Sequence, residues 1–527
     1  MRTLRNPLLP GFYPDPSICR VGGDYYMVTS TFEYYPGVPI FHSRDLVNWH
    51  QIGHCLTRPS QLPLPEGTLP SKGIYAPTIR WHRGTFYMVT TLVRDNDYRN
   101  NINFYVTAED PAGEWSEPII VEGAEGIDPT LFFEGDKAYY LGNMRPAPDS
   151  VGSRNIWLQE LDIRTGTLLG EKHILRTDGA LYNAHCPEAP HLYHIGDYYY
   201  LMIAEGGTER NHAVTIFRSR EIFGPYENNP RNPLITHRNL SRNAPINSTG
   251  HADLIETANG EWWAVLLASR PDGGSFRILG RETYIVPVIW EDEWPVFSPE
   301  TGHVEFTFPA PDLPELRWAP VPACEHFDGK TLPHHFSFLR TPEPADMPCS
   351  LTAHPGHLRL YNRPKPMTGL GNPSFVGRRQ QHLEYCVRAR MCFTPKQNDD
   401  WAGLTILMSA GYQLRMELGL RNGVQLLRMV QCIDGNESIS AYLACNSNEL
   451  LLRIEVTNME AAFSFAPVGE DGFAGTWITA AQGVDLKPYS VIDANRFTGT
   501  FIGMHATAEK KSESYADFDW FEYQPIE

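Results

Sequence analysis

The segment Asp15-Pro16-Ser17-Ile18, followed by the turn Gly23-Asp24-Tyr25-Tyr26, opens a pattern that recurs along the N-terminal part of the chain. Each copy combines a small or acidic residue, a few strand residues, a turn centred on glycine, and a pair of aromatic residues. Successive copies start about sixty residues apart, a spacing typical of repeat architectures. The four later copies begin with Ala76-Pro77-Thr78-Ile79, Asp128-Pro129-Thr130-Leu131, Ala189-Pro190-His191-Leu192 and Ala252-Asp253-Leu254-Ile255.

Each copy has the local chemistry of a β-hairpin. Glycine supplies the positive φ that a tight turn between two strands requires, because it has no Cβ atom to clash. A second pair of strands follows the hairpin, as in Pro39-Ile40-Phe41-His42-Ser43 and Asp45-Leu46-Val47-Asn48-Trp49. Five units of four strands predict a five-bladed β-propeller, which we expect over residues 1–308.

The repeat stops at a proline-rich stretch, residues 309–323, which we interpret as a linker. Residues 324–527 contain further strand patterns, such as Leu404-Thr405-Ile406-Leu407-Met408, separated by turns such as Arg421-Asn422-Gly423. Because no glycine–aromatic repeat continues there, we expect a separate, jelly-roll-like β-sandwich domain. The predicted fold class is therefore all-β, a five-bladed β-propeller followed by a β-sandwich.

The composition argues against several classes of binding partner and of fold. The 527 residues carry a formal net charge of −18, which argues against nucleic acid or an anionic membrane as a partner. The nine cysteines include no CxxC pair, so a disulfide scaffold and a zinc ribbon are both disfavoured. No apolar stretch of about 18 residues, the length that crosses a membrane, occurs in the sequence. Since the N-terminal residues also lack a signal-peptide pattern, we expect a cytoplasmic protein.

The repeat also predicts where acidic side chains meet. In a propeller, the innermost strand of every blade lines the central channel, so equivalent positions of the copies converge near one axis. The first and third copies start with Asp15 and Asp128, and Glu188 stands one residue before the aligned Ala189 of the fourth. His251 precedes the fifth copy, although a histidine considered alone is more often a satisfied core residue.

Several carboxyl groups in one pocket favour a particular chemistry. Like charges held close raise one another's pKa, so one group stays protonated near neutral pH. A protonated acid beside an ionised partner is the machinery of glycoside hydrolysis. The sequence has no HExxH, EF-hand, complete P-loop or GxSxG motif, and we expect no required cofactor. The sequence leaves open whether a cation such as calcium binds in the channel near His251.

Several motifs, taken in order, resemble those of glycoside hydrolase family 43 β-xylosidases, and the resemblance spans essentially the whole chain. It implies an inverting mechanism in which Asp15 activates water, Glu188 protonates the leaving oxygen, and Asp128 orients Glu188 and raises its pKa. Inversion requires the two working carboxyl groups roughly 6.5–9.5 Å apart. The motifs are Asn6 to Ser17, Gly73-Ile74-Tyr75-Ala76-Pro77, Gly126-Ile127-Asp128-Pro129, Cys186-Pro187-Glu188-Ala189-Pro190, Ser248 to Asp253, Leu279-Gly280-Arg281-Glu282-Thr283 and Ala516 to Phe521.

The same resemblance implies the substrate-binding residues. Arg281 matches an arginine that hydrogen-bonds sugar hydroxyls, while Phe32 and Tyr75 would form aromatic walls that stack on the sugar. Close relatives usually have Trp where Tyr75 stands, so the stacking area is smaller here and a hydroxyl group is added. A phenylalanine of the sandwich closes the pocket in similar enzymes, and Phe497 is the best match, with Phe501 next. A closed pocket admits only a chain end, so the expected activity is xylan 1,4-β-xylosidase, releasing xylose from short xylooligosaccharides.

Three alternatives stay open at this level. An α-L-arabinofuranosidase, or an enzyme with both activities, would use the same carboxylates, because arabinofuranose and xylose present similar hydroxyl patterns. A fructan hydrolase of related build is disfavoured, since its usual Asn-Asp-Pro-Asn opening is missing. A sugar-binding propeller without turnover is disfavoured because a binding module needs no proton donor. A homo-oligomer is compatible with the sequence, which does not determine the oligomeric state.

Overall fold

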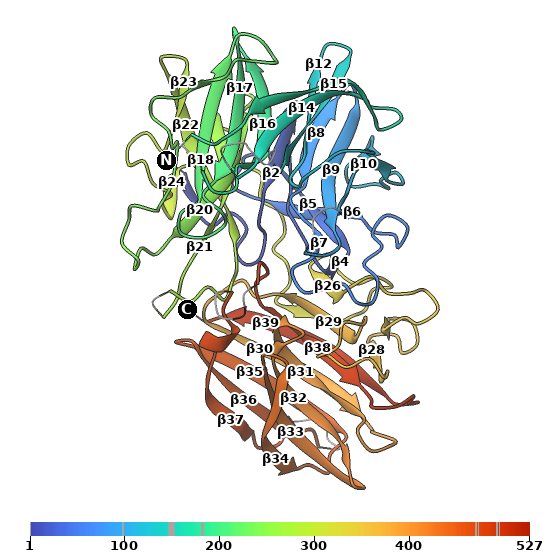
Figure 1. Cartoon of the computed structure of the whole chain (residues 1–527). Coiled ribbons are helices and arrows are strands. Elements are labelled where there is room, and N and C mark those ends of the chain that lie inside the picture. Colours follow the sequence, from blue (N-terminus) through green and yellow to red (C-terminus); the bar gives the residue numbers. More distant parts are fainter. Residues whose placement is uncertain are drawn as a thin grey trace.

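The computed structural model describes residues 2–96, 100–145, 153–180, 184–273, 275–469, 472, 474–491, 494 and 496–526. Within these ranges the chain forms only strands, with one short 3-10 helix at Lys487–Tyr489. Two bodies follow one another along the sequence, a ring of sheets coloured blue to yellow and a sandwich coloured orange to red (Figure 1). The predicted all-β fold, a five-bladed propeller followed by a sandwich, is confirmed.

The propeller has five antiparallel sheets, one for each copy of the sequence repeat. Their innermost strands are the segments that open the copies, and the inner strands of the first four blades, and of the fifth and first, contact one another in turn around the axis. The blades are, in chain order, β2 (Ser17–Val21), β3 (Asp24–Val28), β5 (Gly37–Ser43) and β6 (His50–Leu56); β7 (Gly73–Ile74), β8 (Thr78–His82), β9 (Thr85–Val93), β10 (Ile102–Ala108) and β11 (Ile119–Ile120); β12 (Thr130–Glu134), β13 (Lys137–Met144), β14 (Asn155–Asp162) and β15 (Thr167–Arg176); β16 (Glu188–Ile195), β17 (Tyr198–Glu205), β18 (Ala213–Ser219) and β19 (Glu227–Asn228); and β20 (Asn247–Glu256), β21 (Trp262–Ser269), β22 (Glu282–Glu291) and β23 (Trp294–Phe297).

A buried charge cluster joins the blades at the axis. The Asp253 carboxylate accepts hydrogen bonds from Ser17 Oγ at 2.6 Å, Arg80 Nη1 at 2.8 Å and Tyr193 Oη at 2.6 Å. Arg80 also donates to His191 Nδ1 at 2.8 Å. These five residues come from four blades, so the cluster holds the inner strands in a common arrangement below the expected site. The charge of Arg80, with these hydrogen bonds, lowers the pKa of Asp253 despite its burial.

The two ends of the propeller meet. Strand β1 (Thr3–Arg5) pairs with β24 (Thr307–Pro309), so the ring closes next to the start of the predicted linker. No strand occurs between β24 and β25 (Cys324–Glu325), a stretch described throughout, and this segment packs on the propeller. Its Trp318 ring stacks on His50 with centroids 5.1 Å apart. The segment predicted as a linker therefore packs against the first blade of the propeller.

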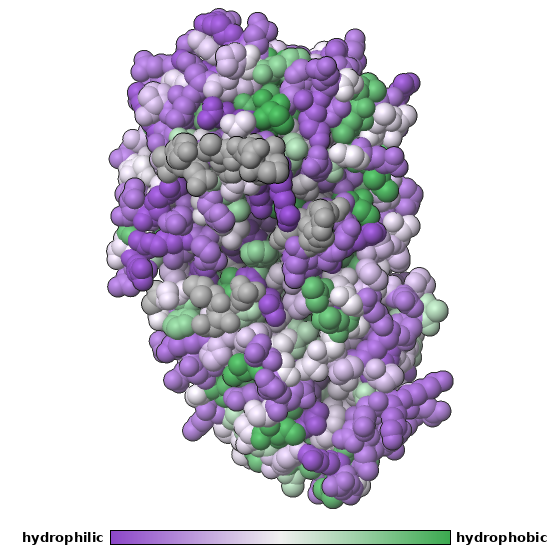
Figure 2. Space-filling view, in the orientation of Figure 1, coloured by the Kyte–Doolittle hydropathy of each residue, from purple (hydrophilic) through white to green (hydrophobic). Residues whose placement is uncertain are grey.

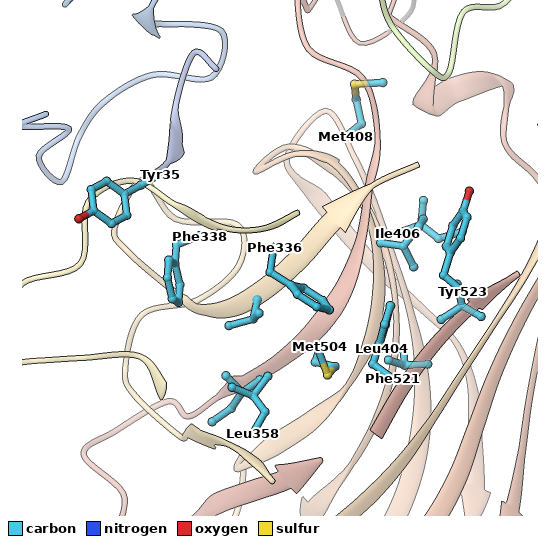
Figure 3. Packing of buried hydrophobic residues seen from close by; sticks show 14 of the residues in the cluster. Tyr35, Phe336, Phe338, Leu358, Leu404, Ile406, Met408, Met504, Phe521 and Tyr523 are labelled. Atoms are coloured by element: carbon cyan, nitrogen blue, oxygen red, sulfur yellow. The ribbon is translucent and has the colours of Figure 1, made fainter. Parts of the chain in front are cut away.

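The sandwich consists of two eight-stranded sheets around an apolar core (Figure 3). The strand patterns expected from the sequence lie in these sheets. One sheet contains β25, β27 (Cys349–Ser350), β28 (Leu358–Tyr361), β30 (Tyr385–Phe393), β35 (Glu449–Thr457), β36 (Glu460–Pro467), β37 (Ile478–Asp485) and β39 (Tyr515–Pro525), and the other contains β4 (Tyr34–Tyr35), β26 (Phe336–Leu339), β29 (Ser374–Arg379), β31 (Trp401–Ser409), β32 (Tyr412–Arg421), β33 (Val424–Ile433), β34 (Asn436–Ala444) and β38 (Phe501–Thr507).

One strand of the second sheet belongs to the propeller part of the chain. β4 lies between β3 and β5 of the first blade and pairs with β26 of the sandwich, with Phe338 opposite Tyr35. Figure 3 shows Tyr35 beside Phe338. A second contact is very close, because a Cβ atom on Gly499 would lie 2.3 Å from the Leu279 carbonyl oxygen. The sandwich is thus attached where blade residues approach the expected site.

The surface in Figure 2 is mainly hydrophilic, with apolar side chains in small separate groups. None of the helical segments in the described part of the chain is long and apolar enough to cross a membrane. All nine cysteines are free thiols, as expected from their spacing.

Candidate active site

The eight residues predicted from the sequence to form the site line one cavity of about 260 Å³ at the axis of the propeller. Seven further residues complete its wall. The predicted residues are Asp15, Phe32, Tyr75, Asp128, Glu188, His251, Arg281 and Phe497, and the additional ones are Ile127, Arg154, His185, Cys186, Gly207, Thr208 and His212. A larger cavity of about 590 Å³ at the fifth blade contains none of the predicted residues.

The carboxylates stand at strained turns that precede the inner strands. Asp15 and Asp128, with φ of 57° and 55°, lie two residues before β2 and β12. Glu188 is the first residue of β16, and the next residue, Ala189, has φ 51°. Left-handed backbone at a residue other than glycine costs of order 1 kcal/mol or more and clusters at functional sites. Left-handed residues at or next to the three carboxylates accompany the entry of their side chains, from three blades, into the same cavity.

Asp15 is fixed in the cavity by two side-chain hydrogen bonds. Arg281 Nη1 donates to its Oδ1 at 2.8 Å, and Ser30 Oγ donates to its Oδ2 at 2.5 Å. The carboxyl group is almost fully buried, as is the arginine. His251 Nδ1 lies 3.7 Å from Asp15 Oδ1, and burial lowers the pKa of this histidine. A carboxylate fixed by an arginine and a serine, with a neutral imidazole beside it, is suited to accept a proton from water.

Asp128 differs from Asp15 because it receives no hydrogen bond from any described residue. Burial, with Glu188 and Asp15 nearby, raises the pKa of Asp128 well above its usual value. Arg154 and Arg281 act in the opposite direction and are outweighed. Asp128 is therefore the group that burial and its neighbours favour in the protonated form.

Glu188 is paired with Arg154, a residue that the sequence analysis did not identify. Arg154 Nη1 donates to Glu188 Oε2, and both side chains are mostly buried. Ser153, the residue before Arg154, fixes this geometry. Its Oγ donates to the Ala184 carbonyl oxygen at 2.9 Å and accepts a hydrogen bond from the Cys186 N–H at 2.7 Å. Arg154 occupies no position of the repeat pattern, so no signal in the sequence singled it out.

Three aromatic rings form one side of the cavity. The Phe32 centroid lies 4.9 Å from that of Tyr75 and 6.2 Å from that of Phe497. The Tyr75 hydroxyl is engaged in the wall of the cavity, because it donates a hydrogen bond to the Ser71 carbonyl oxygen at 3.0 Å. Tyr75 therefore lines the cavity with its ring. Arg281 lies against the same wall, 5.7 Å from the centre of the Phe32 ring.

The two phenylalanines considered for the sandwich contribution have different positions. Phe497 lines the cavity, and its N–H donates to Ser71 Oγ at 3.0 Å. Phe501 is fully buried and stacks on Tyr34 with centroids 3.8 Å apart. It supports the wall from behind and is not part of the cavity lining.

The channel near His251 contains histidines held in the neutral form. Burial lowers the pKa of both His212 and His191 to about 3. The His191 ring lies 6.5 Å from that of His251, centroid to centroid. Among the residues that the structure describes, no three histidine, cysteine, aspartate or glutamate side chains gather in a geometry suited to a metal ion.

A propeller whose axis presents three carboxyl groups, an arginine and an aromatic wall in one cavity has the features of a glycoside hydrolase. Comparison with known proteins identifies the family. The model described as glycosyl hydrolases family 43 matches residues 4–295, and the chain belongs to this family. Residues 324–524 match the beta xylosidase C-terminal concanavalin A-like domain. The resemblance found in the sequence is thereby confirmed, and the chain is a glycosidase.

Similar proteins match over the full length. A xylosidase/arabinosidase of Butyrivibrio fibrisolvens is 41% identical, covering 99% of each chain. A non-reducing end alpha-L-arabinofuranosidase of Bacteroides ovatus is 38% identical, covering 100% of this chain and 96% of that protein. The crystal structure of a xylan beta-1,4-xylosidase from Bacillus halodurans superposes with a TM-score of 0.91 at 35% identity, covering 99% of this chain and 100% of that one.

Proposed function

We propose that the protein is an exo-acting, inverting glycosidase that releases xylose from the non-reducing end of β-1,4-xylooligosaccharides. The observation that carries the proposal is the cavity in which Asp15 and Glu188, from different blades, face a wall completed by Phe497 of the sandwich. Because two bodies enclose it, the cavity suits the end of a chain better than its middle. Relatives described as xylosidases support this substrate.

The residues have distinct roles in this mechanism. Asp15 removes a proton from water, which attacks the anomeric carbon of the bound sugar. Glu188 gives a proton to the glycosidic oxygen as the bond to the leaving sugar breaks. Asp128 acts through Glu188, since two buried carboxyl groups hold a shared proton up to higher pH than either would alone. Arg281 binds the sugar hydroxyls next to Asp15.

The second candidate is an α-L-arabinofuranosidase, or an enzyme with both activities. Two similar proteins are described by arabinose-releasing names, which favours this candidate specifically. Both reactions use the same acid and base. The difference lies in the shape of the sugar that the aromatic wall accepts.

The experiment compares kcat/KM for nitrophenyl β-xyloside, nitrophenyl α-arabinofuranoside and xylobiose. A larger value for the xyloside supports the first candidate, and a larger value for the arabinofuranoside supports the second. Proton NMR of the first-formed sugar should show the inverted anomer, and a retained anomer would contradict the mechanism.

The acid assignment is tested with Glu188→Ala. Removing a general acid costs roughly 10²–10⁴-fold, and we expect this loss on xylobiose, whose leaving group needs a proton. Nitrophenyl xyloside should lose much less, since nitrophenolate leaves without protonation. Equal losses on both substrates would contradict the assignment of Glu188. Asp15→Ala should abolish hydrolysis of both, and appreciable remaining activity would remove Asp15 as the base.

A further inference from the structure

The cavity pairs an arginine with the residue that is proposed as the proton donor. Two ion pairs are present, Arg281 with Asp15 and Arg154 with Glu188. Asp128 has no cation bound to it within the described residues and is the group that burial favours as the neutral acid. An arginine that is hydrogen-bonded to the proposed proton donor competes with the proton that the donor must carry.

We propose that Arg154 forms the binding site for the leaving sugar and, by exchanging Glu188 for that sugar's hydroxyls, lets Glu188 take up the catalytic proton. This inference rests on the proposed function and adds to it a specificity-determining residue. Before binding, the arginine holds Glu188 as a carboxylate and the proton stays on Asp128. When a second sugar ring occupies the cavity mouth, its hydroxyls accept the guanidinium hydrogen bonds instead.

The geometry places Arg154 suitably for this exchange. Its side chain is 23% exposed while that of Glu188 is 11% exposed, so the arginine lies nearer the solvent, where a leaving group would stand. Its neighbour Ser153 is hydrogen-bonded to the segment that leads into Glu188, which fixes the backbone under the arginine relative to Glu188. A guanidinium group has five donors, enough to hold two sugar hydroxyls.

Each proton that moves in the proposed reaction has a donor and an acceptor in the cavity. The proton leaves the Asp128 carboxyl group and adds to the Glu188 carboxylate, which gives it to the glycosidic oxygen as the bond from that oxygen to the anomeric carbon breaks. The attacking water gives one proton to Asp15 and its oxygen to the sugar. The charged and titratable groups that line the cavity with Glu188 are Asp15, Asp128, Arg154, His185, Cys186, His212, His251 and Arg281.

The test uses Arg154→Met, which keeps side-chain length, and Arg154→Lys, which keeps the charge. The alkaline limb of kcat/KM against pH reports loss of the shared proton in the free enzyme. Removing the cation makes ionisation of the carboxyl pair harder, so in Arg154→Met this limb should move up by about one pH unit. In Arg154→Lys the limb should stay close to that of the wild type.

The substrates provide the second readout. Xylobiose has leaving-group hydroxyls and nitrophenyl xyloside has none, so Arg154→Met should lose roughly tenfold more kcat/KM on xylobiose. Arg277→Met is the matched control, because this arginine pairs with Glu209 outside the cavity lining and should leave the alkaline limb in place. Thermal unfolding of each variant separates misfolding from a change at the site.

The outcomes separate the two proposals. If the wild type hydrolyses neither xylosides nor arabinofuranosides, the proposed function fails. If the wild type is active but the alkaline limb of Arg154→Met does not rise, or both substrates lose equally, only the role of Arg154 is overturned. A rise of the limb together with a selective loss on xylobiose supports it.

Discussion

The N–H of Phe497 in the sandwich donates a 3.0 Å hydrogen bond to the hydroxyl of Ser71 in the propeller. The same serine accepts the Tyr75 hydroxyl on its carbonyl oxygen at 3.0 Å and donates its own N–H to Glu33 Oε2 at 2.9 Å. One residue therefore positions two of the three aromatic rings of the wall. Ser71 has φ 63°, a conformation that the surrounding contacts must maintain.

Ser71 should influence substrate binding more than the chemical step. In Ser71→Ala the Phe497 N–H loses its acceptor, and we expect KM for nitrophenyl xyloside to rise roughly tenfold while kcat changes less. Steady-state kinetics measures both. Ser71→Gly is the control, because glycine also lacks the hydroxyl but adopts positive φ without strain. Similar KM values for the two variants would assign the effect to the hydroxyl, and an unchanged KM in both would contradict the positioning role.

Asp128 should set the upper pH limit of activity. Glu188 and Asp128 oppose each other's ionisation, so Asp128→Asn removes a negative charge next to the proposed acid. Ionisation then becomes easier, and the alkaline limb of kcat/KM should move to lower pH, the reverse of the direction expected for Arg154→Met. We expect a shift on the order of one pH unit. Profiles of kcat/KM over pH 4–9 in one buffer system would measure it. A limb that stays in place or moves up would contradict the coupling.

Glu33 should make stability depend on pH. Burial raises the pKa of Glu33 from 4.5 to about 7. Between these values the unfolded chain has released the proton and the folded chain has kept it, so folding stability falls as pH rises across this window. Glu33→Gln cannot ionise and lacks this loss, which amounts to about 3 kcal/mol at most.

The measurement for Glu33 is the difference in Tm between Glu33→Gln and the wild type at pH 5 and pH 7.5. We expect the variant to gain relative to the wild type as pH rises. A difference independent of pH would show that Glu33 does not titrate in this range. Glu66→Gln is the control, since the Glu66 side chain is 56% exposed.

Chelation should leave the activity intact. The described residues contain no cluster of three metal-ligating side chains, and Arg281 and Arg154 already supply positive charge beside the carboxylates. After dialysis against EDTA, kcat/KM should stay within about a factor of two of its starting value, the reproducibility expected of such constants. A larger loss that calcium reverses would establish a cation in the channel near His251.

Much of the fold was predictable because its signals are local. Hairpin turns such as Gly23-Asp24 and Gly196-Asp197 act over a few residues, and their repetition implies a ring of similar blades. The convergence of Asp15, Asp128 and Glu188 in one cavity follows from that ring, since equivalent positions meet at the axis.

The tertiary structure alone decided the contacts between segments that share no repeat. Arg154 pairs with Glu188 where the Ser153 hydroxyl is hydrogen-bonded to the segment before Glu188. Phe497, rather than Phe501, reaches the cavity because its N–H donates to Ser71, which lies 426 positions away in the sequence. Such contacts depend on how the two bodies pack, and packing is set by complementary shapes and hydrogen-bond partners that no short pattern encodes.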